Sequence, residues 1–331
     1  MVKIGLVGLP NVGKTTFFNI LTSANAEIGN FPFTTIDKNI GVYFVKDKNL
    51  EKLAQIFGNR KIEYPSIEII DIAGLVEGAH NGVGLGNRFL AHIREVDLII
   101  FILRGFERGD VPSVMGNVSP LREYEILELE LIFSDLEIIE RRYKKANWEE
   151  RVQLDKIKDK LSKGEKLESI EDIPESVRGA LLSIKPSVII INTDEDLDKG
   201  LKFKNELMQK VGEDVFIIPF GLYKEILESG DEEFFSFLEG FDSIDGVVRR
   251  CLKKLGYIIC YTVKGEIAKG WIVRKGINVY EFAGKIHSDI QKGFIKAKIY
   301  KQVSEKDFIE KIVGRDYIIE HSDIIKIEYR V

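Results

Sequence analysis

One segment constrains the fold of this 331-residue chain more than any other, the octapeptide GLPNVGKT at residues 8–15. It follows the apolar run Ile4–Val7 and precedes the apolar-rich stretch Thr16–Leu21, which is the strand, glycine-rich turn and helix of a phosphate-binding loop. Glycines let the backbone wrap closely around an anion, and the N–H groups at the start of the helix point at it. We expect Lys14 to reach the outer phosphates of a nucleotide and the Thr15 hydroxyl to ligate Mg²⁺.

Four further apolar runs have the length and composition of buried strands. Longer helical or loop segments separate them, as in an alternating strand and helix layout. Such a layout predicts an α/β fold, a phosphate-loop NTPase domain with a doubly wound, mainly parallel sheet. The four runs are Ile67–Ile72, Leu98–Leu103, Ser187–Ile191 and Val215–Pro219.

A charged segment between Leu121 and Ile184 breaks this rhythm. Its apolar residues have helical spacing, Asn147 and Glu150 form a capping pair at the start of a second helix, and Gly164 marks its end. The pattern predicts a helical hairpin, and two ordinary surface helices are the alternative. From Tyr257 onward, short β-type runs and one helical stretch predict a small α+β module. We therefore expect a nucleotide-binding domain of residues 1–120 plus 185–256, an insert of residues 121–184 and a C-terminal module of residues 257–331.

Composition places the chain among ordinary globular proteins. The chain is 44% hydrophobic and 31% charged. No stretch approaches the roughly 18 apolar residues of a membrane span, and no secretory leader is expected. The two cysteines, Cys251 and Cys260, have no metal-ligand spacing, which favours packing roles over a redox role in a reducing, cytoplasmic compartment.

Charge is unevenly distributed along the chain. The formal net charge is −5, yet the segment from Tyr257 to the C-terminus has fourteen Lys and Arg residues against ten Asp and Glu. Lys292, Lys296 and Lys298 could form an RNA-binding face on this basic module. A solvated, lysine-rich strand edge explains the same residues equally well.

A second nucleotide-site signature is DIAG at residues 71–74, at the end of a buried strand. In phosphate-loop enzymes an aspartate here holds Mg²⁺ through water, and the glycine N–H senses the γ-phosphate. These roles fall on Asp71 and Gly74. A switch threonine is expected between the two signatures, where Thr35 is the preferred Mg²⁺ ligand and Thr34 the alternative.

Leu75 stands where small GTPases have a glutamine that orients the attacking water. A leucine side chain can neither donate nor accept a hydrogen bond, so we expect slow intrinsic hydrolysis or help from a partner. His80 and His92 are candidate replacements, although structural or surface roles suit both histidines better. Asn11 in the phosphate loop is a candidate ligand for a K⁺ ion that would supply positive charge near the phosphates.

The segment NTDE at residues 192–195 decides the choice of base. Guanine-specific relatives have Asn-Lys-x-Asp, in which the aspartate accepts two hydrogen bonds that only guanine donates. Here the lysine is absent and the carboxylate, on Glu195, is one methylene longer, which favours ATP over GTP. Asn192 can pair with an edge that offers one donor and one acceptor, as adenine does. A one-residue shift that lets Asp194 read guanine is the alternative.

These residues resemble the YchF family, the Obg-like ATPases within the translation-factor class of phosphate-loop proteins. The matching strings are GLPNVGKTTFFNILT, NFPFTTIDKNIGV, DIAGLVEGAHNGVGLGNRFLAHIRE, NTDE, GWIVRKGINVYEFAGKIHSDIQKGFIKA and DYIIEHSDIIKIEYRV. They extend over nearly the whole chain. The resemblance implies an ATPase domain with a coiled-coil insert and a C-terminal TGS domain, a small β-grasp-like module. The insert is shorter here than is usual in the family, and the base loop after Pro219 departs from the family's small-residue pattern.

The resemblance also implies an activity and a set of site residues. The family prefers ATP, has a hydrophobic residue in place of the catalytic glutamine and associates with ribosomes, here through the large subunit or its RNA. The TGS domain and the insert would make that contact in a monomer that binds no membrane. Lys14, Thr35 and Gly74 would act in catalysis, with His92 as a weaker candidate, and Thr15, Thr35 and Asp71 would hold Mg²⁺. Contacts to the nucleotide would come from Asn11, Val12, Gly13, Lys14, Thr15, Thr16, Asn192 and Leu222.

Two other functions are consistent with parts of the pattern. A GTPase of the neighbouring Obg or developmentally regulated group has a similar glycine-rich switch, but NTDE and the lack of an N-terminal glycine-rich domain speak against it. A nucleotide-gated RNA- or protein-binding module, in which hydrolysis is incidental, is the non-enzymatic alternative. The sequence favours a Mg²⁺-dependent ATPase that acts as a molecular switch in translation or the stress response.

Overall fold

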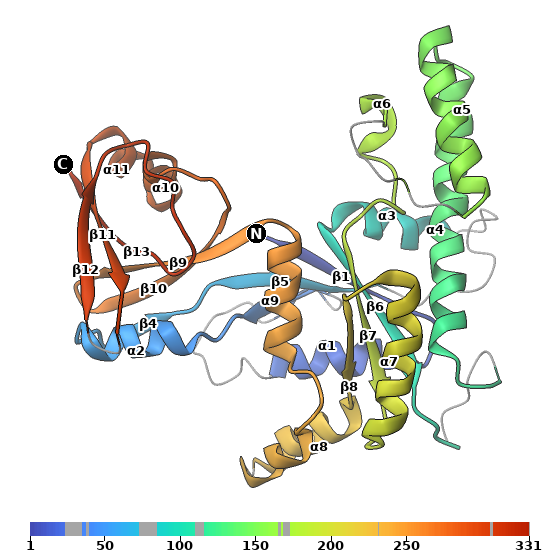
Figure 1. The fold of residues 1–331 in the computed structure, drawn as a ribbon, viewed down its shortest axis with the longest axis horizontal. Helices are drawn as coiled ribbons and strands as arrows, with labels where there is room; N and C mark the ends of the chain where they lie inside the picture. Colours follow the sequence, from blue (N-terminus) through green and yellow to red (C-terminus); the bar gives the residue numbers. More distant parts are fainter. Residues whose placement is uncertain are drawn as a thin grey trace. The chain divides into compact units, whose positions relative to one another are not determined.

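The computed structural model describes residues 1–23, 35–37, 40–72, 85–109, 116–164, 167, 173–230, 232–304 and 307–330, with the backbone alone at 35–37, 85–88 and 232–234. The chain divides into two compact units (Figure 1). The first unit contains residues 1–43 and 68–247, and the second contains residues 44–67 and 248–331.

The first unit is built on a seven-stranded sheet in the order β2-β3-β5-β1-β6-β7-β8. The five strands from β5 to β8 pair in parallel, and β2 pairs with β3 in the antiparallel direction. The predicted α/β fold with a mainly parallel sheet is therefore confirmed. The strands are β1 (Lys3–Val7), β2 (Thr35–Asp37), β3 (Ile40–Phe44), β5 (Ser66–Asp71), β6 (Leu98–Gly105), β7 (Ser187–Thr193) and β8 (Val215–Ile218).

Burial explains why these strands read as continuous apolar runs in the sequence. Every residue of β6 is buried, as is every residue of β7 after its first, because helices cover both faces of a parallel sheet. The helices of this sheet are α1 (Lys14–Ser23), α3 (Leu85–Glu95), α7 (Leu197–Val211), α8 (Phe220–Ser229), the 3₁₀ helix η2 (Glu232–Leu238) and the start of α9 (Ile244–Lys254).

The predicted helical hairpin is present in the first unit. Helix α4 (Pro120–Tyr143) packs with its first half on β6 and α7 and with its second half on α5 (Trp148–Ser162). Asn147 caps α5 by accepting a hydrogen bond from the Glu150 N–H at 2.9 Å, and Gly164 follows with a φ of 69°. A separate apolar cluster, including Ile139, Leu154 and Ile157, joins the two helices to the short helix α6 (Glu175–Arg178).

The second unit is a six-stranded sheet in the order β12-β11-β13-β9-β10-β4. Helices α10 (Val279–Ile286) and α11 (Ser288–Lys292) accompany it, and residues such as Phe282, Ala297 and Ile325 form its core. The sequence did not predict β12, because Ile309 and Ile312 in this strand are 60% and 58% exposed and do not form a buried run. The strands are β4 (Lys61–Glu63), β9 (Tyr257–Lys264), β10 (Ile267–Arg274), β11 (Phe294–Gln302), β12 (Phe308–Val313) and β13 (Ile324–Tyr329).

The predicted domain boundaries are wrong at two places. We assigned residues 248–256 and residues 44–67 to the nucleotide-binding domain, but both belong to the second unit. The larger difference is the segment of residues 44–67. Strand β4 pairs in parallel with β10, and the apolar side of α2 (Lys48–Ile56) is buried there. A Cβ atom on Gly270 would come within 2.6 Å of Pro65, so β10 and this segment are in close contact. The local pattern of helix and strand is the same in either unit, so the sequence could not show which sheet it joins.

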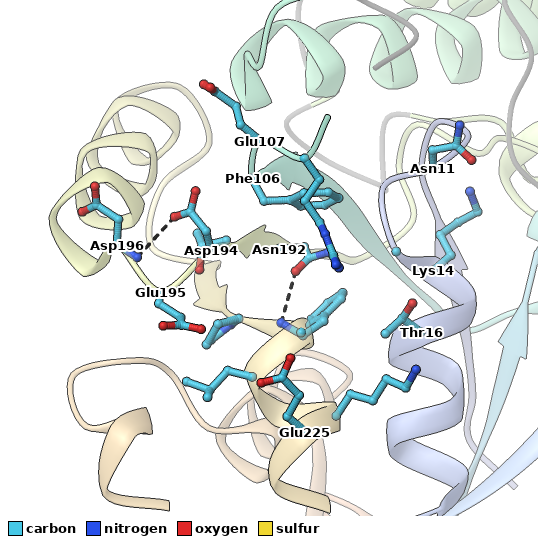
Figure 2. A pocket seen from close by; sticks show the side chains of 18 of the residues that line it. Asn11, Lys14, Thr16, Phe106, Glu107, Asn192, Asp194, Glu195, Asp196 and Glu225 are labelled. Atoms are coloured by element: carbon cyan, nitrogen blue, oxygen red, sulfur yellow. Dashed lines mark hydrogen bonds between the residues drawn. The ribbon is translucent and has the colours of Figure 1, made fainter. Parts of the chain in front are cut away.

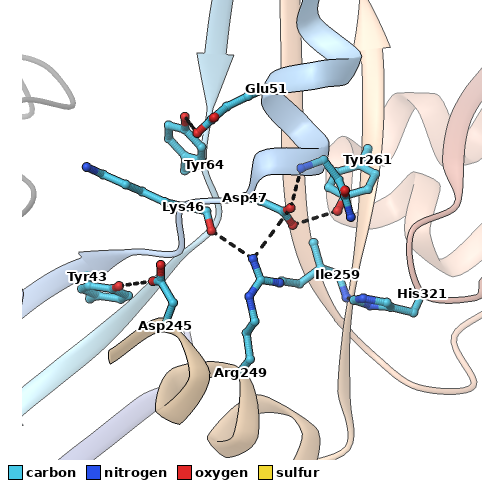
Figure 3. A network of polar contacts seen from close by, with 11 residues as sticks. Tyr43, Lys46, Asp47, Glu51, Tyr64, Asp245, Arg249, Ile259, Tyr261 and His321 are labelled. Carbon is cyan, nitrogen blue, oxygen red and sulfur yellow. Dashed lines mark hydrogen bonds and ion pairs between the residues drawn. The ribbon is translucent and has the colours of Figure 1, made fainter. Parts of the chain in front are cut away.

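Asp47 anchors this segment to the second unit (Figure 3). Its carboxylate is buried and caps α2 by accepting a hydrogen bond from the Asn49 N–H at 3.0 Å. The Tyr261 hydroxyl donates to the other carboxylate oxygen at 2.7 Å, and the Arg249 guanidinium lies 3.7 Å away. Donors from α2, α9 (Ile244–Lys254) and β9 therefore converge on one buried carboxylate.

Two of the lysines proposed for an RNA-binding face have acidic partners on neighbouring strands. Lys296 lies 3.4 Å from Glu328, and Lys298 lies 2.8 Å from Glu310. These pairs favour the solvated strand edge over a free basic patch. Both cysteines are buried and free. No helix in the described ranges is long and apolar enough to cross a membrane.

We predict that Asp47→Ala lowers the free energy of unfolding of the second unit by about 2–4 kcal/mol, since it removes a helix cap and leaves the Tyr261 hydroxyl without its acceptor. Urea titration would measure this change. Of the two tryptophans in the chain, only Trp271 lies in the second unit, so its fluorescence in a Trp148→Phe background reports on that unit.

Asn278→Ala is the matched control, because Asn278 caps α10 in the same unit through the Glu281 N–H at 2.8 Å. This variant should lower the free energy of unfolding by only about 1 kcal/mol. Equal losses from the two variants would show that the contacts of Asp47 beyond its cap contribute nothing.

Candidate nucleotide-binding site

The loop between β1 and α1 has the backbone geometry of a phosphate-binding loop. Gly13 has a φ of 103°, and a Cβ atom there would lie 2.5 Å from the amide nitrogen of Asn192. At Gly8 a Cβ atom would lie 2.4 Å from the Ile102 carbonyl oxygen of β6. Both glycines are therefore required, one by its conformation and both by the close approach of neighbouring groups. The predicted strand, loop and helix are all present.

Lys14 folds back over this loop. Its Nζ donates to the carbonyl oxygens of Gly8 at 3.0 Å and Leu9 at 2.8 Å, and the residue is only 8% exposed. Burial lowers the pKa of its ammonium, while the nearby carboxylates of Asp71 and Glu123 act in the opposite direction. An ammonium has three N–H donors, so one remains for a phosphate oxygen.

The two predicted Mg²⁺ ligands on described side chains lie together. The Thr15 hydroxyl at the start of α1 donates to the Asp71 carboxylate at the end of β5 over 2.8 Å. Burial raises the pKa of Asp71, and the hydrogen bond from Thr15 and the charge of Lys14 partly offset this. A hydroxyl and a carboxylate are the hard oxygen donors that Mg²⁺ prefers, so the residues present fit the ion. Among the described residues, no three His, Cys, Asp or Glu side chains lie close enough together to hold a metal ion.

Asn192 joins the phosphate loop to the opposite wall of the site (Figure 2). Its side-chain amide donates to the Val12 carbonyl at 3.0 Å and accepts from the Phe220 N–H at 3.2 Å. The residue is 6% exposed. These contacts hold the loop, the end of β7 and the start of α8 together, a positioning role that the sequence did not predict.

A cavity of about 840 Å³ extends from the phosphate loop past Asn192. Asn11, Gly13, Lys14, Thr15, Thr16, Asn192 and Leu222 line it, as predicted for nucleotide-contacting residues. Val12 does not line it and contributes its carbonyl to Asn192 instead. Phe106, Glu107 and Arg108 also line the cavity, and they were missed because they follow β6 in a loop without a recognisable motif.

The two carboxylates of the base segment differ in their surroundings. Asp194 accepts from the Asp196 N–H at 3.2 Å and lies 3.3 Å from Lys199, so it is held by the turn before α7. Figure 2 shows that hydrogen bond and the separate direction of Glu195, which also lines the cavity.

A buried hydrogen bond connects the start of α4 to the strand end beside this cavity. Glu123, in the first turn of α4, accepts from the Arg104 N–H at 2.8 Å. The Arg104 guanidinium lies 4.3 Å from the centre of the Phe106 ring and donates to the Phe106 carbonyl at 3.1 Å. Burial raises the pKa of Glu123 to about 7, and the Arg104 N–H and the charges of Arg104 and Lys14 limit the rise.

Several predicted residues cannot be placed as side chains. Thr35 lies in β2, but only its backbone is described, and Thr34, Gly74, Leu75 and His80 lie outside the described residues. His92 is exposed on α3 and does not line the cavity. The roles of these residues in catalysis and metal binding remain predictions.

Two family models match the chain. The model described as a 50S ribosome-binding GTPase matches residues 3–133, and the model of the YchF GTPase C-terminal domain, described as a protein of unknown function, matches residues 257–330. Proteins named "Ribosome-binding ATPase YchF" match over their full length. The one from Bacillus subtilis is 32% identical, and the one from Buchnera aphidicola subsp. Acyrthosiphon pisum is 34% identical, each with 99% of both chains covered.

Two solved structures match over almost the whole chain. The Schizosaccharomyces pombe YchF GTPase has a TM-score of 0.81 at 25% identity, covering 99% of this chain and 97% of that one. A GTP-binding protein from Pyrococcus horikoshii has a TM-score of 0.63 at 19% identity, covering 99% and 100%, which supports the fold alone.

We predict that Glu123→Gln changes how stability depends on pH. The raised pKa means that the folded state holds the Glu123 proton more tightly than the unfolded chain, so the wild type loses stability relative to the variant as pH rises from 4.5 to about 7. The change in the stability difference should be about 1–3 kcal/mol. Urea unfolding at pH 5 and pH 8 measures it, with Glu125→Gln on the same helix as the control. A difference that is the same at both pH values would contradict the prediction.

Proposed function

The chain belongs to the YchF family of phosphate-loop proteins, and from this premise we propose that it is a Mg²⁺-dependent ATPase that acts as a molecular switch on the ribosome. The observation that carries the proposal is that Lys14, Thr15 and Asn192 line one cavity. Asp71 accepts a hydrogen bond from Thr15, and no aspartate stands at the guanine-reading position. The full-length similarity to relatives named as ribosome-binding ATPases supports both the activity and the partner.

The names of similar proteins disagree on whether the nucleotide base is adenine or guanine. The matched family model and the S. pombe structure are named as GTPases, whereas the bacterial relatives are named as ATPases. We favour ATP because Glu195 replaces the aspartate that guanine requires, and Asp194 is held by Asp196 and Lys199. A side-chain amide has two N–H groups and two acceptor positions, and the main-chain contacts of Asn192 use one of each. The remaining pair suits the donor and acceptor edge of adenine, with Leu222 as an apolar contact.

The phosphate loop and the charged side chains beside it would bind the phosphates and the metal. The loop N–H groups, Lys14 and Thr16 would hold the phosphates, and Thr15, Thr35 and, through water, Asp71 would hold Mg²⁺. When bound, the ion neutralises charge on the phosphate oxygens. Lys14 supplies a positive charge that is already desolvated in the folded protein, so its attraction to phosphate is strong. Gly74 would sense the γ-phosphate through its N–H.

Slow intrinsic turnover is expected because Leu75 cannot orient water. The ribosome and a K⁺ ion near Asn11 are the proposed accelerators, and Asn11 lies at the rim of the cavity with a φ of 65°. His92 is exposed on α3, which makes it a weak candidate for positioning water.

The partner is proposed to be the large ribosomal subunit or its RNA. The helical insert and the C-terminal unit, which we propose to be a TGS domain, are the surfaces that would make this contact. The protein would act as a monomer. It would work in the cytoplasm, where reducing conditions agree with its two free, buried cysteines. A GTP-specific switch of the Obg type is the alternative function.

We predict that nucleotide-free protein binds ATP at least about tenfold more tightly than GTP in Mg²⁺ and K⁺, which corresponds to about 1.4 kcal/mol. Isothermal titration with each nucleotide measures the ratio. Asn192→Ala should weaken the binding of ATP more than the binding of GTP, because it removes the adenine contact as well as the support of the loop. Equal or tighter GTP binding by the wild type would replace the ATPase proposal with the GTPase alternative.

We also predict that Thr15→Val lowers ATP affinity at least about tenfold in Mg²⁺ and leaves it nearly unchanged in EDTA, since only the metal contact is lost. The comparison needs one titration in each buffer. Thr22→Val is the control, because Thr22 is in the same helix but hydrogen-bonds only to main-chain carbonyls of α1. A loss of equal size with and without Mg²⁺ would contradict the assignment of Thr15 to the metal.

A further inference from the structure

A second cavity lies entirely within the second unit. Its volume is about 750 Å³, close to the 840 Å³ of the nucleotide site, and the two cavities share no lining residue. Both volumes fall within the range of about 300–1,000 Å³ that is usual for small-molecule sites. Its walls come from the end of α9, the start of β9, the turn after β10 and the loop before β13.

The walls of this cavity are mainly apolar. Leu252, Ile259 and Ile319 are buried at its base, and Ile258 is half-buried. Ile318 is 50% exposed at the mouth. The apolar surface is concave, so it suits a small molecule better than a flat protein or nucleic-acid surface.

Cations surround the mouth. Lys253 on α9 and Lys275 in the turn after β10 are exposed, and their ammonium groups form no hydrogen bond or ion pair with any residue that the structure describes. The carboxylate at the rim, Glu320, is already paired with Lys301 at 2.7 Å. The uncompensated charge at the mouth is therefore positive.

Two further groups give the mouth fixed hydrogen-bond donors. Arg249 is held by the Lys46 carbonyl at 3.0 Å and by Asp47 (Figure 3). The Nδ1 of His321 accepts from the Ile259 N–H at 3.2 Å, so the proton of the neutral ring is on Nε2. Figure 3 shows Arg249, Ile259 and His321 next to one another, and all three line the cavity.

We propose that this cavity binds a small organic anion with an apolar body, at a site separate from the nucleotide pocket. The apolar walls would gain little from a small hydrated anion, and a neutral apolar molecule would gain nothing from the charges of Lys253 and Lys275. A ligand with both features satisfies the walls and the mouth together. A mononucleotide and an aromatic carboxylate both have this chemistry.

The test uses a matched pair of fluorescent probes on the full-length protein, with Mg²⁺ and one equivalent of ADP present. One equivalent fills the nucleotide site and leaves little free ADP to compete with the probe at the second cavity. The anion 8-anilinonaphthalene-1-sulfonate should bind saturably at one equivalent and at least about tenfold more tightly than uncharged N-phenyl-1-naphthylamine. Lys253→Glu combined with Lys275→Glu should lower the affinity for the anionic probe by about tenfold. Ile318→Ser should lower the affinity for both probes by about threefold. Lys292→Glu, at an exposed lysine outside the cavity, is the control.

Thermal unfolding of each variant would show that the fold is intact, which is expected because all the changed side chains are exposed. Displacement of the probe by AMP would assign a phosphate ligand, and displacement by 1-naphthoate alone would assign a carboxylate; either result supports the site. Binding that does not saturate, equal affinity for the two probes, or affinity unchanged in both cavity variants would overturn the proposal.

Discussion

The nucleotide pocket depends on one side-chain amide. Asn192 stands at the end of β7, donates to the Val12 carbonyl of the phosphate loop and accepts from the N–H of Phe220 at the start of α8. Phe220 in turn stacks on Phe17 of α1, with ring centres 4.8 Å apart. The phosphate loop and the base side of the cavity are therefore fixed to each other by buried contacts before any ligand is bound. Such preorganisation reduces the entropy lost on binding.

Buried charge is the second feature of this site. Lys14 and Glu123 are buried and Asp71 is partly buried, and burial shifts the pKa of each toward the neutral form. Ionisable groups with shifted pKa values are concentrated at functional sites because folding has already paid for their desolvation. Glu123 also belongs to α4, whose far half forms the insert with α5. The insert thus begins in the shell of residues that surrounds the nucleotide cavity.

The second unit is assembled from two distant parts of the chain. Residues 44–67 supply α2 and an edge strand to a sheet that otherwise comes from residues after 256. Asp47 accounts for this arrangement, since a buried carboxylate is stable only where donors surround it, and Asn49, Tyr261 and Arg249 do so. The same Arg249 borders the proposed anion cavity, so the network that anchors the segment also shapes that site.

The sequence by itself determined the elements whose signals are local. The phosphate loop, the buried strands and the cap at Asn147 depend on residues close together in the chain, and each was found where predicted. The tertiary structure decided what depends on contacts between distant residues. Only it showed that Asn192 supports the phosphate loop, that Phe106 lines the cavity, and that residues 44–67 join the C-terminal sheet. The physical reason is that a hydrogen bond or a strand pairing between distant residues leaves no periodic pattern in the sequence, because its energy depends on where the fold brings the two partners.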